Sequence, residues 1–282
     1  MQPVEFKNLF RHIKKCNTAK LQKDFLPFKA HNQIIGWVRP SFMDTLQKHH
    51  VVMEENNICT LPAQYSIEML GNQLIENNMV SSMNELFDVY PSPYAKPVGK
   101  IDRAVIPDLG LIGTGVHLNG LVKKRNQIYL WIAKRAKYKR LDPKKLDHIV
   151  AGGIPAGFTH NNTLEKEARE EASIPNALMI NAEYKSLITY SMIRPEGLRR
   201  DVLYCYDLWL PEDFQPVPND GEVESFQLKK LEDVYHQVCE TDDFKFNVNL
   251  VLIDLFIRMG IIAKNSQYAH RIKTGLRGKL FP

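Results

Sequence analysis

The sequence lacks the features that mark secreted, disulfide-stabilised and membrane-spanning proteins. Its four cysteines are widely separated and form no CxxC pair, which excludes a disulfide framework and indicates a reducing compartment. The most apolar segment, residues 248–263, is interrupted by polar and charged residues and is too short to span a bilayer. The first 20 residues have no continuous apolar stretch, so no secretory signal is expected. We therefore expect a soluble, cytoplasmic protein with no membrane partner.

Motifs for nucleic-acid binding and for phosphoryl transfer are also missing. No zinc-finger spacing and no basic-aromatic interleaving occurs, so no nucleic-acid partner is expected. A Gly-x4-Gly-Lys-Ser/Thr loop is absent as well, which argues against kinase activity. The net charge is +5, and the basic excess is concentrated in residues 123–125 and 134–145. That excess is explained equally by a solvated basic hairpin and by a rim that steers anions to a site.

The length and composition predict two domains. The chain has 282 residues, and 44% of them are hydrophobic, which suffices for two modest cores. The proline-rich stretch 91–97 cannot continue a helix or a central strand. We expect a small α+β domain over residues 1–108 and a second domain over residues 109–282. In the first domain the spacing predicts a strand over 33–38 and helices over 6–16, 41–49 and 79–89.

The second domain is predicted to be a mixed sheet flanked by helices, which makes the whole chain α+β. Residues 116–122 and 129–135 are expected to form a hairpin. The other predicted elements are strands over 148–151, 184–193, 202–210 and 223–228, a helix over 163–172 that Pro175 ends, and a C-terminal helix over 247–259.

A glycine-rich turn followed by an acidic helix is the most informative feature of the chain. Gly152 opens the turn, and Glu167, Glu170 and Glu171 follow at i, i+3 and i+4 on one helical face. Like charges on one stripe repel one another by a few tenths of a kcal/mol per pair, so a divalent cation that neutralises them is the natural explanation. The combination predicts a site that holds metal beside a diphosphate.

The opposite face of this predicted helix is apolar. Leu164, Ala168 and Ala172 recur at helical spacing and are expected to dock the helix on the sheet, which leaves the carboxylates at its edge. Asn162 and Glu165 have the spacing of a capping pair and predict the start of the helix.

The turn and the helix together resemble the signature box of the Nudix hydrolases, a family that cleaves diphosphate bonds. Gly152 matches the leading glycine of the box, and Glu167, Glu170 and Glu171 match its three metal-binding glutamates. The chain departs from the box at Phe158, Lys166 and Ser173, where glutamate, arginine and glycine are usual. None of these departures removes an expected metal ligand, although Lys166 lacks the planar fork of arginine.

Further segments resemble the two-domain Nudix branch related to thiamine pyrophosphokinase. These are residues 36–40, 115–120, 130–135, 168–175, 220–224 and 250–260. The resemblance covers nearly everything after about residue 30. It implies a Nudix α/β/α sandwich with a mixed sheet, preceded by a small α+β domain. It also implies hydrolysis of thiamine diphosphate, or of damaged analogues, to the monophosphate.

We expect Mg²⁺ or Mn²⁺ to be held by Glu167, Glu170, Glu171 and the carbonyl of Gly152, so that a polarised water attacks phosphorus. Lys166 would orient the glutamates. A general base or an additional metal ligand is expected from Glu222, Glu224 or both, since the two are predicted to share a face at the start of a strand. A loop role that keeps this edge soluble is the alternative.

Contacts to the small-molecule diphosphate substrate are assigned less directly. The basic pair Arg135 and Lys137 precedes the box and suits phosphate, with plain solvent exposure as the alternative. His117 and Asn119 share a face of one strand and suit hydrogen bonds to a ring or, equally, a satisfied structural role. Two aromatic side chains, Trp131 and Tyr190, would stack on a ring or belong to the core. Two other functions remain open: a pyrophosphatase of dinucleotides or nucleotide sugars, and a non-catalytic Nudix domain that senses a ligand or binds a partner.

Overall fold

A computed structural model describes residues 2–49 and 51–280 of the chain. Its N-terminal part contains a four-stranded sheet in the order β2-β1-β4-β3 and a separate ribbon of β5 and β6. The strands are β1 (Leu26–Ala30), β2 (Gln33–Val38), β3 (Met53–Glu55), β4 (Ile58–Thr60), β5 (Leu86–Val89) and β6 (Gly99–Asp102). The helices are α1 (Pro3–Cys16), α2 (Leu21–Asp24), α3 (Pro40–Lys48), α4 (Ile67–Glu76) and the 3₁₀ turn η1 (Arg103–Val105).

One hydrophobic core organises residues 28–111. It includes buried residues of α3, α4, β5 and β6. The side chain of Ser66 caps α4 by accepting the backbone N–H of Met69 at 3.0 Å, which satisfies one donor of its first turn. The division at residue 108 lies close to the end of this core and stays our proposed domain boundary.

The prediction of a helix over residues 79–89 is wrong. The helix of this region is α4, which ends at Glu76, and residues 86–89 form β5 instead. Asn78 and Asn84 adopt positive φ angles of 56° and 53°, which a helix does not allow. Pairing of β5 with β6 is a tertiary interaction that overrides the local helical spacing.

The second part contains a large mixed sheet in the order β11-β12-β7-β8-β13, with β10 paired to β7 and β9 paired to β8. Strand β12 runs parallel to β7, and the other pairs are antiparallel. The bounds are β7 (Ile112–Lys124), β8 (Gln127–Arg135), β9 (Leu146–His148), β10 (Val150–Gly153), β11 (Glu183–Arg194), β12 (Gly197–Trp209) and β13 (Val223–Lys230). The predicted hairpin and mixed sheet are confirmed.

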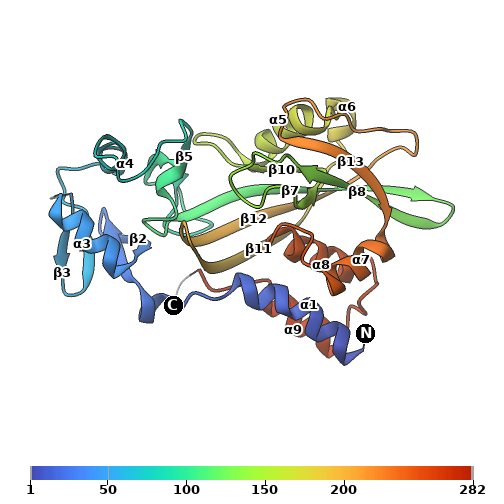
Figure 1. Ribbon diagram of the computed structural model, residues 1–282, viewed down its shortest axis with the longest axis horizontal. Helices are drawn as coiled ribbons and strands as arrows, with labels where there is room; N and C mark the ends of the chain where they lie inside the picture. Colours follow the sequence, from blue (N-terminus) through green and yellow to red (C-terminus); the bar gives the residue numbers. More distant parts are fainter. Residues whose placement is uncertain (1, 50, 281–282) are drawn as a thin grey trace.

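Helices cover both faces of this sheet (Figure 1). On one side lie α5 (His160–Ala172) and α6 (Asn176–Met179), and on the other lie α7 (Leu231–Glu240), α8 (Val248–Arg258) and α9 (Gln267–Gly275). Helix α1 packs beside α7, α8 and α9, so the first helix of the chain shares a core with the last ones. The α+β class and the three-layer arrangement expected from the sequence are confirmed.

Helix α5 has a defined cap residue at each end. Thr159 is the N-cap and accepts the backbone N–H of Asn162 at 3.2 Å, so the helix begins before the predicted capping pair. Ser173 ends it in the left-handed conformation with φ 52°. The predicted apolar face is confirmed, since Leu164, Ala168 and Ala172 are buried.

Within residues 2–49 and 51–280, no helix combines the length and the apolar character that crossing a bilayer requires. The four cysteines are free thiols in buried positions.

Candidate active site

A cleft of about 640 Å³ lies where the N-terminal part meets the large sheet. Phe87 of β5 and Arg103 of η1 line it from the N-terminal part. Its other walls come from β7, the segment 138–141, the end of β10, helix α5 and the segment 220–222. The glycine turn and the acidic helix therefore open onto one cavity that both parts of the chain build.

The absence of a side chain at Gly152 makes room for a carboxylate. A Cβ at this position would lie 2.6 Å from Cδ and 2.8 Å from Oε2 of Glu167. Such distances are shorter than carbon contacts allow. The glycine backbone and Glu167 are therefore in close contact, as the predicted metal site requires.

Lys166 neutralises part of the acidic face. Its Nζ lies 2.7 Å from Oε2 of Glu170 and 3.1 Å from Oε1 of Glu167. The ion pairs raise the pKa of the lysine, led by the hydrogen bond to Glu170. Burial raises the pKa of Glu167, against the influence of the lysine. The lysine thus holds two of the three glutamates without the planar fork of arginine.

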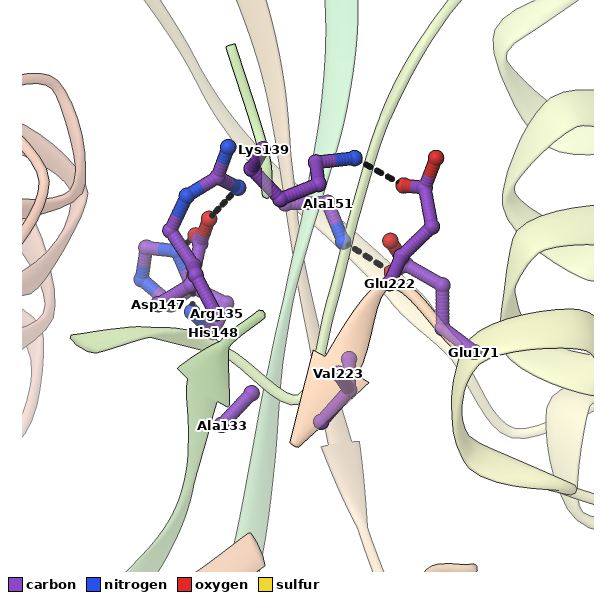
Figure 2. A pocket seen from close by; sticks show the side chains of 9 residues that line it. All are labelled: Ala133, Arg135, Lys139, Asp147, His148, Ala151, Glu171, Glu222 and Val223. Atoms are coloured by element: carbon purple, nitrogen blue, oxygen red, sulfur yellow. Dashed lines mark hydrogen bonds and ion pairs between the residues drawn. The ribbon is translucent and has the colours of Figure 1, made fainter. Parts of the chain in front are cut away.

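Glu171 is the buried member of the triplet, with 6% of its surface exposed. Its Oε2 accepts the backbone N–H of Ala151 at 2.8 Å, which joins α5 to β10 (Figure 2). Burial raises the pKa of this carboxyl well above its usual value, and the nearby acids Glu167, Asp147 and Glu222 raise it further. A fully buried carboxylate among other acids is stable when a cation is bound beside it.

Three carboxylates converge at this point. Each of Glu171, Asp220 and Glu222 offers an oxygen within 4.8 Å of the others. The backbone N–H of Glu222 donates to Oδ1 of Asp220 at 2.7 Å, which shapes the short segment between them. Asp220 was not assigned to the site from the sequence, although its position two residues before Glu222 was a visible signal.

The structure separates Glu222 from Glu224. Glu222 lines the cleft and forms an ion pair with Lys139 (Figure 2). A register shift interrupts β13 between Val223 and Ser225, so Glu224 leaves the regular alternation. Glu224 instead pairs with Lys134 at 3.1 Å and does not line the cleft.

A buried ionic network lies directly behind the acidic cluster. Asp147 is 4% exposed and accepts from Arg135 at 2.7 Å, and Nζ of Lys245 lies at 3.5 Å from it. Burial alone would raise the pKa of Asp147, but Lys245 and Arg135 outweigh it and hold that pKa well below its usual range. Burial lowers the pKa of Lys245, which Asp147 opposes. Arg135 also donates to carbonyls of Leu141 and Asp142, so it fixes this loop as well as lining the cleft.

His117 lines the cleft and pairs with His148, their Nδ1 atoms lying 3.0 Å apart. Burial lowers the pKa of both imidazoles, to about 4 for His148. Two such neutral rings can share one proton, one as donor and the other as acceptor. With Asp147 they form a second group of closely spaced ligand atoms. Lys245 and Arg135 beside it already supply positive charge, so this group does not suit a metal ion.

Four predicted substrate contacts lie outside the cleft. Asn119 is buried and donates to Asp207 at 2.8 Å. Trp131 belongs to the core beneath α5, and Tyr190 to the core beneath α8, where its hydroxyl donates to Asp201. Lys137 is exposed on the loop after β8. Trp131 and Tyr190 were expected either to stack on a substrate ring or to pack in the core, and their positions agree only with core packing.

The donor set fits a divalent metal. Glu171, Asp220 and Glu222 form the closely spaced set, while Glu167 and Glu170 line the cleft and pair with Lys166. Hard oxygen ligands of this kind are those that Mg²⁺ and Mn²⁺ prefer. The space that only glycine leaves at residue 152 brings one carboxylate against the backbone. A buried carboxylate with no cationic side chain beside it is energetically unfavourable, and a bound divalent cation would remove that cost.

The chain is similar to several known proteins. A family model described as "Domain of unknown function (DUF4743)" matches residues 8–112. Nudix hydrolase 20, chloroplastic, of Arabidopsis thaliana is 36% identical over 280 residues, covering 91% of this chain and 74% of its own length. Nudix hydrolase 24, chloroplastic, of the same plant is 36% identical over 271 residues, covering 90% and 73%.

Among solved structures, a Deinococcus radiodurans protein covers 60% of this chain and 97% of its own, with 20% identity and a TM-score of 0.45. The similarity to the two plant proteins covers 91% and 90% of this chain, so it extends over both of its parts. Members of this family use a divalent metal. The chain therefore belongs to the Nudix hydrolase family, and the protein is a hydrolase of pyrophosphate bonds.

Proposed function

We propose that the protein hydrolyses the phosphoanhydride bond of thiamine diphosphate, or of damaged analogues, and releases the monophosphate. The observation that carries the hydrolase part is the convergence of Glu171, Asp220 and Glu222 beside Glu167 and Gly152. The substrate part rests on the resemblance of the sequence to the thiamine-related branch. A volume of about 640 Å³ lies within the range of small-molecule sites.

The proposed metal is Mg²⁺ or Mn²⁺, held by Glu167, Glu170, Glu171 and the carbonyl of Gly152. When bound, such an ion neutralises diphosphate charge and makes a coordinated water more acidic. The protein groups contribute the rest. Lys166 holds Glu167 and Glu170 in place, and the Ala151 N–H fixes the orientation of Glu171.

Glu222 is the proposed base. It lies at the cleft, within 4.8 Å of the buried Glu171, and its ion pair with Lys139 holds the carboxylate in place for proton transfer from water. Glu224, which the sequence left as an equal candidate, is held away by Lys134. Asp220 orients the backbone of Glu222 and adds an acceptor to the cluster.

Other cleft residues suit an organic group attached to the diphosphate. Ile106, Leu198 and Leu203 give an apolar surface, and His117 and Asn247 add polar atoms. Oδ1 of Asn247 is buried and has no hydrogen-bond partner among the described residues. An amino group on a heteroaromatic ring, such as that of an aminopyrimidine, would supply the missing donor.

A substrate panel tests the proposal. Thiamine diphosphate, its oxidised analogues, dinucleotides and nucleotide sugars are incubated with the protein, with and without Mg²⁺, and phosphate and monophosphate products are quantified. Metal-dependent turnover of the thiamine compounds, at a higher kcat/KM than the nucleotides, is the expected result. Release of nucleoside monophosphates in preference would transfer the assignment to nucleotide derivatives. Absence of turnover with every compound would instead favour a ligand-sensing or interaction module.

A cytoplasmic location is proposed from the cysteine usage, whereas the names of both Arabidopsis relatives call those proteins chloroplastic. A fluorescent fusion of the full-length protein in its source cell distinguishes cytoplasm from organelle.

A further inference from the structure

The N-terminal part is attached directly to the glycine turn. The backbone N–H of Ala156 donates to the carbonyl of Leu86 at 2.8 Å, and that of Gly157 donates to Oδ2 of Asp88 at 2.8 Å. Both acceptors belong to β5. The conformation of the turn that carries Gly152 therefore depends on a strand of the N-terminal part.

Two side chains of the N-terminal part also contact this turn. A Cβ on Gly153 would lie 2.5 Å from Cζ of Phe87 and 3.4 Å from Cζ of Arg103. Cζ of Arg103 lies 5.2 Å from the centre of the Phe87 ring, within cation–π range. The guanidinium is thus held against the backbone of the residue that follows Gly152.

Arg103 is fixed in place yet remains accessible. Its Nη1 donates to Oε2 of Glu85 at 2.7 Å, and its backbone N–H donates to the carbonyl of the same residue at 2.8 Å. The arginine side chain is 43% exposed and lines the cleft. A guanidinium has five N–H donors, so one ion pair and one ring contact leave donors for a ligand.

The position of Arg103 complements that of the carboxylates. Successive residues of a strand face opposite sides, so Glu167 approaches Gly152 from one side of β10 while Arg103 approaches Gly153 from the other. Both side chains line the same cleft. A diphosphate bound across the turn would have the acidic cluster on one side and a guanidinium on the other.

Most other cations of the cleft are committed to acids within the protein. Lys139 pairs with Glu222, Lys166 with two glutamates, Arg199 with Asp201 and Lys245 with Asp147. Arg140 forms no ion pair among the described residues and contacts Sδ of Met83 at 4.0 Å. Arg103 pairs with a single, partly exposed glutamate and is the cleft cation that lies against Gly153. Its planar fork matches paired phosphate oxygens, which a lysine cannot reproduce.

We propose that Arg103 binds non-bridging oxygens of the substrate's diphosphate, with Phe87 and Glu85 as the positioning residues that hold it. The N-terminal part, which matches a domain family of unknown function, thereby completes the diphosphate site. This inference rests on the proposed diphosphate hydrolysis, but it does not depend on the identity of the organic group.

The first test measures affinity for imidodiphosphate, a non-hydrolysable diphosphate, by calorimetry in the presence of Mg²⁺. Arg103→Gln removes hydrogen bonds between two charged groups and is expected to weaken binding roughly 10- to 100-fold. Arg103→Lys should bind with intermediate affinity. In turnover the same variants should raise KM far more than they lower kcat.

The matched control is Arg271→Gln. Arg271 also stacks over phenylalanine, at 4.9 Å from the Phe6 ring, but it lies on α9 and does not line the cleft. This variant removes a comparable cation–π contact and should bind imidodiphosphate as the wild type does. Wild-type affinity in Arg103→Gln would overturn the proposal.

A second measurement needs no variant. Phenylglyoxal modifies accessible arginines, and mass spectrometry of the full-length protein reports the extent at Arg103. Imidodiphosphate with Mg²⁺ should protect Arg103 and leave Arg271 reactive. Equal modification of Arg103 with and without the ligand would contradict the assignment. Protection without any thiamine diphosphate turnover would support the diphosphate site and refute the proposed substrate.

Discussion

Replacing Gly152 with alanine tests the close contact between the glycine turn and Glu167. The new Cβ would lie 2.6 Å from Cδ and Cγ of Glu167, whereas carbon atoms pack at about 3.5–4.0 Å. The carboxylate must therefore move by about 1 Å. Displacement of a reacting or ligating group by this distance lowers rates by about 100-fold, which corresponds to about 2.7 kcal/mol in the activation barrier.

The same substitution should cost little in folding. The contact is made by the end of a flexible side chain, whose exposed fraction is 15%, so rotation relieves the overlap. Overpacking of a rigid core typically destabilises by about 1–3 kcal/mol, and the movable carboxylate should bring the loss to the lower end of that range, about 1 kcal/mol. We expect Gly152→Ala to lose kcat and Mg²⁺ affinity while it keeps a cooperative thermal transition.

Gly260→Ala is the matched control for this experiment. Gly260 follows α8 with φ 84°, and a Cβ there would meet nothing within 4 Å. An alanine in the left-handed region costs about 1–2 kcal/mol, so this variant loses stability without a change at the site. Release of phosphate from thiamine diphosphate, Mg²⁺ binding and thermal melting are compared. A kcat within twofold of the wild type in Gly152→Ala would refute the reasoning, as would equal losses of activity in both variants.

Three further predictions concern the acidic side chains. Burial raises the pKa of Glu171. Without metal, the stability that its protonated form contributes is therefore present below the ordinary pKa of 4.5 and is lost as pH rises. Glu171→Gln should abolish this pH dependence in thermal melts of chelator-treated protein from pH 4 to 8, and it should also abolish turnover. Glu222→Gln should lower kcat by about 100-fold while Glu224→Gln stays within about twofold; equal kinetic effects would reject the assigned base. Asp147→Asn leaves two buried cations uncompensated and should destabilise the fold by about 3 kcal/mol, measured by urea unfolding; an unchanged midpoint would contradict the network.

The sequence predicted the parts of the site whose residues lie close together along the chain. Glu167, Glu170 and Glu171 were predicted to act together because helix geometry fixes which side chains share a face, and Gly152 was predicted from the glycine-rich turn before them. The apolar stripe of α5 followed from the same periodicity, and its burial is confirmed. Local spacing decided these features before any tertiary contact formed.

Assignments that depended on the orientation of a strand side chain were less secure. Asn119, Trp131 and Tyr190 lie in the interior, since alternation defines two faces but not which face borders a cavity. The bulge in β13 changed the relation between Glu222 and Glu224, and a bulge has no fixed sequence pattern here. The helix predicted over residues 79–89 gave way to β5, whose pairing partner lies beyond the proline-rich stretch.

The sequence by itself determined the acidic helix, the glycine turn and the family to which they belong, because each is encoded within about 20 consecutive residues. Only the tertiary structure decided what surrounds them. Arg103 and Phe87 reach the turn from the N-terminal part, and Lys245 arrives beside Asp147 from the segment before α8. Residues this far apart along the chain meet through the packing of whole elements, and no local periodicity records that packing.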